Sequence, residues 1–284
     1  MDKDSIRHEI VSHNPDIDVR FYLSVDGGSY VPPHWHNSLE LVYMLEGSMT
    51  VIYEDKRVKI NPTEISIVNP RVIHAVSSVK NKALVLQIPN SIFEKYVPNY
   101  NLIRFNADIN PKNVVDKTKL DRLKKIFYDM YIVYDVRPNA YLLRFNSLLY
   151  DLLYSLVHSY SYYISEKAAE YENKKLDKIK DMMFYIEKNH KEKISTNNVV
   201  SAFGYNSDYA ARIFKEAIGM TMTQYLYEIR LNEVNNDLHF KNKTINDILE
   251  YHGCTNYKYF MKLFKERYGC TPKKKREEYL KKSE

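Results

Sequence analysis

The chain has 284 residues, more than most single hydrophobic cores contain, which predicts two domains. Its charged N-terminus, the lack of any run near the roughly 20 apolar residues of a membrane span, and a count of two cysteines exclude a signal peptide, a membrane partner and a disulfide framework, so we expect a cytoplasmic protein. The net charge of +6 is uneven, because residues 174–284 carry 22 Lys and Arg against 15 Asp and Glu while residues 1–173 carry 20 against 21, which predicts a polyanionic partner for the C-terminal part alone.

Short strands are predicted between residues 19 and 90. They are Val19–Leu23, Leu39–Leu45, Met49–Tyr53, Ile65–Val68 and Ala83–Ile88. Each is rich in Val, Ile and Tyr, and turn residues such as Asp26-Gly27-Gly28 separate them. Many short strands at this spacing indicate a β-sandwich or a β-barrel.

Two imidazoles and a carboxylate stand close together in PHWHNSLE, at His34, His36 and Glu40. Side chains two residues apart in a strand share a face, so these three are expected to point to one inner surface. Imidazole and carboxylate are ligands for transition metals, but they also line polar pockets.

The period changes at Val114, from which two amphipathic helices are predicted. Their apolar residues are Leu120, Leu123, Phe127, Met130 and Tyr134 in the first helix, and Phe145, Leu148, Leu152 and Leu156 in the second. Arg137-Pro138-Asn139 forms the turn between them. These faces could pack on the barrel or on a second copy of the chain, and we predict the second arrangement, a homodimer. The polar tract Ser165–Lys175 is predicted to be the linker.

The basic region contains an internal repeat of about fifty residues. Gly204 is followed by FKEAIG, and Gly253 by FKERYG. In each copy a polar N-cap residue, Ser195 or Thr244, precedes a short apolar helix, a glycine turn and a longer helix. Two copies of this helix-turn-helix arrangement in the only basic part of the chain predict a DNA-binding domain.

These residues resemble the AraC family of bacterial transcription regulators over essentially the whole chain. The resemblance rests on Arg212-Ile213-Phe214-Lys215, Gly219-Met220-Thr221, Tyr225, Arg230-Leu231, Ile248, Gly253, Tyr259-Phe260, Phe264-Lys265, Gly269 and Thr271-Pro272. Upstream, the spacing of Gly28, His34, His36, Glu40 and Gly47 is similar to the first cupin signature, and NPRVIH, ending at His74, is similar to the second without its glycine.

The resemblance implies an α+β protein that regulates transcription in response to a ligand. Residues 1–165 would form a cupin-like sensor, with a barrel at about 19–110 and a two-helix dimerisation segment at about 114–164; residues 174–284 would form an all-α domain with two helix-turn-helix motifs. Expected partners are double-stranded promoter DNA, a small-molecule effector such as a sugar, a second copy of the chain and RNA polymerase. No cofactor and no catalysis are expected. The alternative is a metal-dependent cupin enzyme, an isomerase or dioxygenase, with a helical appendage.

Recognition helices read bases from their N-terminal turns and meet phosphates at their edges. The predicted DNA-contact residues are Asn206, Ser207, Asp208, Ala211, Arg212 and Lys215 in the first copy, and Asn256, Tyr257, Lys258, Met261, Lys262 and Lys265 in the second. Arg212 is the first choice for a base contact, since a guanidinium can bind guanine O6 and N7 together. Phe214, Tyr259, Phe260 and Phe264 are predicted to be core residues.

The predicted ligand-binding residues are His34, Trp35, His36, Glu40, Tyr43 and His74. We predict a polar pocket without metal, in which Trp35 and Tyr43 offer stacking surfaces. If a metal were bound, His34, His36, Glu40 and His74 would hold it. A third interpretation places the histidines in a closed core.

Two positions depart from the family pattern, which prefers alanine four residues before each turn glycine. This chain has Val200 and Leu249 there. Extra methylene groups at a tight helix contact cost roughly 1–3 kcal/mol unless neighbouring residues make room. Ala210 and Ala211 could provide that room for Val200, whereas no such compensation is visible for Leu249.

Overall fold

A computed structural model describes residues 9, 11–53, 56–107, 111–240 and 243–282. Their contacts divide the chain into two compact units, one within residues 7–176 and the other within residues 177–284. No helix in these ranges is both long enough and apolar enough to cross a membrane.

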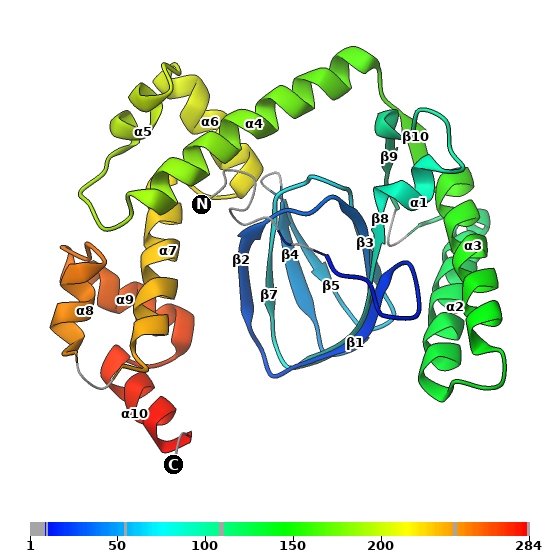
Figure 1. The fold of residues 1–284 in the computed structure, drawn as a ribbon, viewed down its shortest axis with the longest axis horizontal. Helices are drawn as coiled ribbons and strands as arrows, with labels where there is room; N and C mark the ends of the chain where they lie inside the picture. Colours follow the sequence, from blue (N-terminus) through cyan, green and yellow to red (C-terminus); the bar gives the residue numbers. More distant parts are fainter. Residues whose placement is uncertain (1–8, 10, 54–55, 108–110, 241–242, 283–284) are drawn as a thin grey trace. The chain divides into compact units, whose positions relative to one another are not determined.

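Two four-stranded antiparallel sheets form the first unit (Figure 1). One has the strand order β1 (Arg20–Asp26), β8 (Asn81–Pro89), β3 (Ser38–Glu46) and β6 (Ile65–Val68); the other has β2 (Tyr30–His34), β7 (His74–Ser78), β4 (Met49–Tyr53) and β5 (Lys56–Ile60). The five predicted strands are confirmed to within a few residues. Strands β2, β5 and β7 were not predicted, because the prolines of YVPPH and the charges of KRVKI conceal their strand character.

The alternation of side chains along β3 separates two apolar regions. Val42 and Met44 point into the space between the sheets, where they pack with Val51 and Val85. Leu39 and Leu41 belong to a different cluster, which includes the helices that follow the barrel. At the end of β3, Gly47 has φ +75°, and a Cβ atom there would lie 2.1 Å from the carbonyl oxygen of Lys80. Only glycine fits this turn without strain.

Helices α2 (Val114–Val136) and α3 (Tyr141–Ser159) form a hairpin that packs on the barrel (Figure 1). Leu123 and Phe127 are fully buried, and the Phe127 ring lies 5.7 Å from that of Phe21 on β1. The predicted use of the α2 apolar stripe for dimerisation is therefore wrong, since burial against the chain's own barrel leaves none of it for a partner. Helix α3 is also shorter than predicted, since it ends at Ser159 and not at about residue 164.

Short elements complete this unit. They are α1 (Asn90–Glu94), the 3-10 helix η2 (Tyr100–Leu102), β9 (Ile103–Phe105) and β10 (Ser161–Tyr163). Strand β10 pairs with β9, so residues 161–163 are extended where helix was predicted.

The polar tract predicted as a linker is helical. It forms the first half of α4 (Glu166–Lys188), in which Glu170 and Lys174 make an ion pair at 2.6 Å one helical turn apart. Boundary residues Leu176 and Asp177 lie inside this helix. The polar side chains of this tract therefore belong to a solvated helix face. The predicted linker loop is not found among the described residues here.

The second unit contains two helix-turn-helix motifs, as predicted. The elements after α4 are α5 (Thr196–Ala202), α6 (Ser207–Ile218), α7 (Met222–Asp237), α8 (Ile245–Tyr251), α9 (Tyr257–Tyr268) and α10 (Pro272–Lys282). Ser195 and Thr244 form capping boxes at the starts of α5 and α8, which confirms both predicted N-caps.

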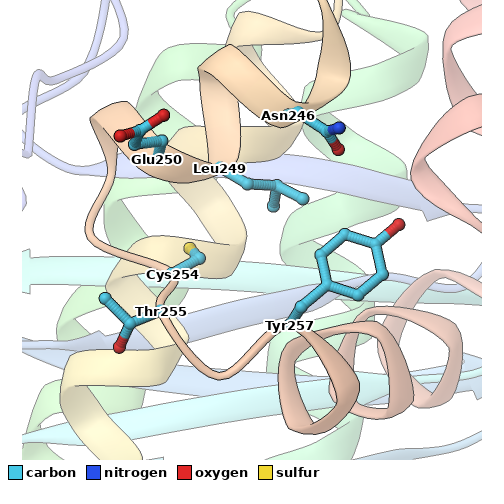
Figure 2. Close-up of a pocket in the computed structure, with 6 residues that line it drawn as sticks. All are labelled: Asn246, Leu249, Glu250, Cys254, Thr255 and Tyr257. Atoms are coloured by element: carbon cyan, nitrogen blue, oxygen red, sulfur yellow. The ribbon is translucent and has the colours of Figure 1, made fainter.

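The two departures from alanine are accommodated differently. Val200 is buried in the first motif together with Ala210, while Ala211 faces solvent and provides no room. Leu249 lines an open cavity of about 480 Å³ with Cys254 and Tyr257 (Figure 2). Leu249 is nevertheless buried, in an apolar cluster with Phe260 and Phe264.

Candidate functional site

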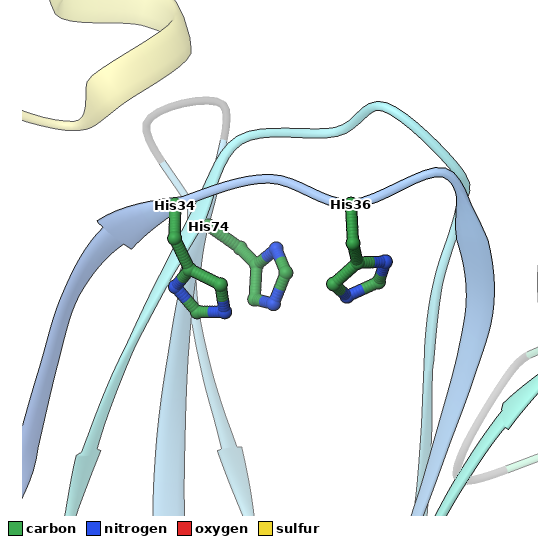
Figure 3. Close-up of side chains that lie close together, drawn as sticks. All are labelled: His34, His36 and His74. Carbon is green, nitrogen blue, oxygen red and sulfur yellow. The ribbon is translucent and has the colours of Figure 1, made fainter. Parts of the chain in front are cut away.

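Three imidazoles gather at one end of the barrel. His34 ends β2, His36 lies in the turn before β3, and His74 begins β7 directly opposite His34 in the antiparallel register. The His74 ring lies 4.2 Å from that of His34 and 5.1 Å from that of His36, between ring centroids. Figure 3 shows the three rings directed to the same side of the backbone. We call these residues and Glu40 the histidine cluster.

The protonation of each ring follows from its backbone contact. The Nδ1 atoms of His34, His36 and His74 lie 3.0, 2.9 and 3.1 Å from the carbonyl oxygens of Pro32, Ser38 and Val72. A carbonyl only accepts hydrogen bonds, so Nδ1 carries the proton in each neutral ring. All three rings then present an Nε2 lone pair, and one ligand atom from each lies within 4.8 Å of the others.

Glu40 supplies a carboxylate to the same space. Its oxygens lie 3.3 Å from His36 Nε2 and 3.8 Å from His74 Nε2, and Gln87 donates a hydrogen bond to it at 2.8 Å. Burial alone would raise the pKa of Glu40, but His36, His74 and Gln87 outweigh it and lower the pKa to about 2. Glu40 is therefore a carboxylate at neutral pH.

The imidazoles respond to this environment in opposite directions. Burial and the neighbouring His34 lower the pKa of His74 to about 3, so His74 is neutral. Burial also opposes charge on His36, but Glu40 and Glu9 outweigh it and raise the pKa of His36. Among the described residues, the buried Nε2 atom of His74 has no hydrogen-bond partner, and that of His36 has none apart from the Glu40 carboxylate 3.3 Å away. Such atoms are costly unless a ligand, an ion or water satisfies them.

A cavity of about 630 Å³ opens from this cluster into the barrel. It is lined by His34, Glu40, His74, Gln87, Glu9, Tyr22, Ser24, Asp26, Ser29, Ser78 and Asn81, together with Val25, Val31, Pro32, Val42, Met49, Val76 and Val85. The prediction missed Glu9 and Gln87, which hydrogen bond to each other at 3.0 Å. Alternation along the predicted strand Ala83–Ile88 would have placed Val85 and Gln87 on one face; nothing local identifies Glu9.

Three of the predicted pocket residues do not line the cavity: Tyr43, Trp35 and also His36, although the His36 ring lies only 5.1 Å from that of His74. Tyr43 is an odd-numbered residue of β3, so it points away from Glu40, and its ring packs 6.3 Å from that of Phe127 on α2. Trp35, which lies between His34 and His36 in the sequence, is buried but does not line the cavity. The prediction that Trp35 and Tyr43 offer stacking surfaces to a ligand is therefore wrong. Successive side chains of a strand alternate between its two faces, so these odd-numbered residues point away from the face that carries His34, His36 and Glu40. Tyr22 is an aromatic residue that does line the cavity.

The histidine cluster fits a divalent transition metal. Three Nε2 lone pairs and one carboxylate make a suitable donor set, and each ring is held by a hydrogen bond from its other nitrogen, as metal-binding histidines usually are. Such an ion would give the buried Nε2 atom of His74 a partner. Hydroxyl groups of an organic ligand would satisfy the same atoms.

The second candidate site is the outer face of α6 and α9. Most predicted DNA-contact residues are exposed there, namely Asn206, Asp208, Ala211, Arg212, Lys215, Asn256, Tyr257, Lys258, Lys262 and Lys265; Ser207 and Met261 are partly buried. Asn206 and Asn256 have a structural role as well, since each accepts a hydrogen bond as the N-cap of its helix.

Two of the predicted contact residues make only long side-chain contacts. The Arg212 guanidinium lies 5.8 Å from the centre of the Tyr209 ring, and Lys262 lies 3.8 Å from Glu266. Phe214, Phe260 and Phe264 are fully buried, which confirms them as core residues. Tyr259 is 38% exposed and packs edge-on against Tyr227, so its predicted burial is only partial.

Comparison with known proteins finds matches in both units. A helix-turn-helix domain family matches residues 199–278, and a cupin domain family matches residues 21–88. The probable transcription factor PqrA of Proteus vulgaris is 33% identical over 86 residues, which cover 30% of this chain and 70% of that protein. The uncharacterized HTH-type transcriptional regulator YobQ of Bacillus subtilis is 23% identical over 241 residues, covering 84% of this chain and 86% of that protein.

Other matches cover about a third of this chain. The uncharacterized HTH-type transcriptional regulator YisR of Bacillus subtilis is 32% identical over 88 residues, and the match spans only 31% of its length and 31% of this chain. Among solved structures, the C-terminal domain of AraT, a response regulator from Geobacillus stearothermophilus, has a TM-score of 0.33 at 23% identity, covering 35% of this chain and 84% of that one.

Proposed function

This chain belongs to the AraC family of transcription regulators, and from that premise we propose that a small molecule bound in its barrel controls how its two helix-turn-helix motifs bind promoter DNA. The single observation that carries ligand binding is the buried Nε2 atom of His74, which has no hydrogen-bond partner among the described residues and borders a cavity of about 630 Å³. A buried nitrogen without a hydrogen-bond partner is unfavourable, so its position beside a cavity favours a bound molecule that supplies the partner.

The chemistry of the cavity favours a neutral hydroxylated effector, such as a carbohydrate or a related small molecule. Hydroxyl groups can donate to the Nε2 atoms of His36 and His74 and to the carboxylate of Glu40. Val42 and Val85 line the same cavity and would contact the carbon skeleton. No Lys or Arg belongs to the described lining, while Glu9 and Glu40 do, which disfavours anionic ligands.

A bound metal is a second candidate for the same atoms. His34, His36, His74 and Glu40 would hold it, and it would supply a Lewis acid that binds an oxygen atom of the effector. The matched domain families and the relatives named as transcription regulators favour sensing over the cupin enzyme alternative.

DNA contact is assigned to the exposed faces of α6 and α9. Arg212 and Asp208 stand one helical turn apart near the start of α6, where side chains reach base edges. Lys215, Lys262 and Lys265 are exposed further along the two helices, as expected of phosphate contacts. RNA polymerase is the further partner expected if the protein activates transcription.

Dimerisation is assigned to the outer face of the α2–α3 hairpin instead of the buried stripe. Leu143, Tyr150 and Tyr154 lie along one exposed face of α3 at helical spacing, and Tyr128 and Ile132 are exposed on α2. Exposed aromatic and aliphatic groups at this density favour association with an identical face.

The test combines DNA selection with ligand screening on the full chain. Purified protein would first be used to select its target from a random pool of duplexes. A panel of neutral monosaccharides would then be screened for a change in melting temperature and in affinity for the selected duplex. We expect at least one compound to change both quantities in the natural protein and neither in His74→Ala. Compounds that act equally on the variant, or a selected duplex whose affinity no compound alters, would contradict the proposal.

A further inference from the structure

Three segments meet where the two helix-turn-helix motifs come together within the second unit. His190 lies in the turn after α4, Asp237 ends α7, and His252 caps the end of α8. Gly253 is packed so closely here that a Cβ atom would lie 2.4 Å from the carbonyl oxygen of Lys191. The turn of the second motif therefore rests directly on the segment that leads into the first.

A continuous chain of hydrogen-bonding atoms runs through this junction. His190 Nδ1 lies 2.7 Å from the carbonyl oxygen of Glu187, His190 Nε2 lies 3.3 Å from His252 Nδ1, and His252 Nε2 lies 3.1 Å from Asp237 Oδ2. The planes of the two rings are only 19° apart, so the facing nitrogens are suitably oriented. His252 is buried and His190 is partly buried.

The number of protons on this chain is set by its two ends. The Glu187 carbonyl accepts only, so His190 Nδ1 must donate, and the Asp237 carboxylate likewise requires a donor on His252 Nε2. With both rings neutral, two lone pairs would face each other across 3.3 Å. One added proton turns this contact into an N–H···N hydrogen bond, whereas two added protons would oppose two N–H groups.

We propose that His190 and His252 share one added proton, and that this proton positions the two helix-turn-helix motifs for simultaneous contact with DNA. This rests on the proposed DNA-binding function of α6 and α9. Without the proton the motifs remain linked by α7, but the junction between His190 and His252 loses its bond. The two histidines are positioning residues, since neither belongs to the predicted DNA-contact face.

Surrounding charges set the pH at which the proton binds. Burial lowers the pKa of His252, and Asp237 opposes this effect, so uptake is expected below the value of about 6.5 that is typical of an exposed imidazole. Other charged or titratable groups at the junction are Glu233 and Arg230 on α7, Lys243 beside Asp237, Lys191 beside Tyr251, Glu187, whose side chain binds Tyr225, and Cys254, whose thiol lies 3.8 Å from the carbonyl oxygen of His252. The motifs are thus expected to couple more strongly as the pH falls.

The experiment compares two duplexes with the full-length protein between pH 8 and pH 5.5. One is a target selected in vitro from random DNA; the other is truncated so that it spans only one major groove. Because an added positive charge strengthens binding to both, the ratio of the two affinities isolates the coupling between motifs. We expect this ratio to rise roughly fivefold as the pH falls.

Matched variants make the result specific. His252→Gln cannot titrate and should give a ratio that does not depend on pH. His239→Gln is the control, since His239 is exposed, stacks on Tyr279 at 4.0 Å and lies outside the chain of bonds, so it should keep the dependence. Asp237→Asn retains an acceptor oxygen but removes the charge, and should shift the midpoint to lower pH.

Imidazole nitrogen NMR tests the shared proton without DNA. The resonances of His190 and His252 should titrate with one common midpoint, and that midpoint should move in Asp237→Asn. Independent midpoints for the two rings would overturn the proposal even if DNA binding is confirmed. If the two rings share one midpoint but the ratio of the two duplex affinities does not change with pH, the positioning role would be overturned. Since NMR does not require DNA, failure of the proposed function is distinguishable from failure of the proton chain.

Discussion

The carboxylate of Asp16 accepts a hydrogen bond from the Tyr134 hydroxyl at 2.7 Å, across 118 residues of sequence. Tyr141 donates to the other carboxylate oxygen at 2.6 Å. The segment before β1 is thereby fastened to the tip of the α2–α3 hairpin. These hydrogen bonds, first from Tyr141 and then from Tyr134, lower the pKa of Asp16.

We expect Asp16→Asn to reduce the free energy of unfolding at pH 7 by about 1–2 kcal/mol, since charge-assisted hydrogen bonds are lost at a partly exposed site. The pKa of Asp16 is lower in the folded than in the unfolded state, so this contribution is present above about pH 4 and is lost as the pH falls through the folded pKa. Urea unfolding at pH 7 and pH 3 should show the difference between variant and natural protein shrinking on acidification. Asp18→Asn, at an exposed neighbour, should show neither effect.

Gly47→Ala should destabilise the barrel by about 2–4 kcal/mol, because the added Cβ would collide with the Lys80 carbonyl at a positive φ angle. Gly27→Ala is the matched control, since a Cβ there meets nothing within 4 Å. Thermal or denaturant unfolding would measure both variants. Equal stability of the two would show that the β3–β4 turn can move aside.

His36→Ala should weaken effector binding by roughly 1–3 kcal/mol, the usual cost of a lost buried polar partner, while affinity for DNA without effector changes little. If the histidine cluster instead holds a structural metal, a chelator should lower the melting temperature of the natural protein and the variant should already melt at that lower temperature. One melting series with and without chelator separates these outcomes. A variant that melts normally and still responds to effector would contradict both.

The two faces of the α2–α3 hairpin should respond to substitution in different ways. Leu123→Ala removes a fully buried side chain and should cost about 2–5 kcal/mol of stability. Leu143→Glu alters a side chain that is 76% exposed, so it should leave the folding of the single chain intact and weaken self-association. Sedimentation at micromolar concentration would measure the second effect. A natural protein that sediments as a monomer would rule out the proposed dimer face.

Arg212 and Lys215 should separate base recognition from phosphate binding on α6. Arg212→Ala is expected to cost about 1–3 kcal/mol and to relax selectivity at one base pair of the selected target. Lys215→Ala should weaken binding equally for all sequences and reduce the slope of log affinity against log salt by about 1. Repeating the in vitro selection with each variant would decide. Unchanged selectivity in Arg212→Ala would move the base contact to Asp208 or Ala211.

Local patterns in the sequence predict five of the barrel strands, the α2–α3 hairpin, the two helix-turn-helix motifs and part of both sites. The helix-turn-helix repeat follows from caps and glycine turns, which act within a few residues, as at Ser195 and Thr244. Strand parity placed His36 and Glu40 on one inner surface, and the same rule applied consistently would have excluded Tyr43.

Tertiary packing alone decided what those surfaces face. The periodic stripe that contains Leu123 predicts a buried helix face, but periodicity is the same whether the cover is the chain's own barrel or a partner. Glu9, Gln87 and Glu40 meet only because β8 lies beside β3 and Glu9 lines the same cavity. His190 and His252 are 62 residues apart, and their hydrogen bond depends on how two motifs pack. Spacing along a chain determines local conformation, whereas contact across such distances requires the three-dimensional fold.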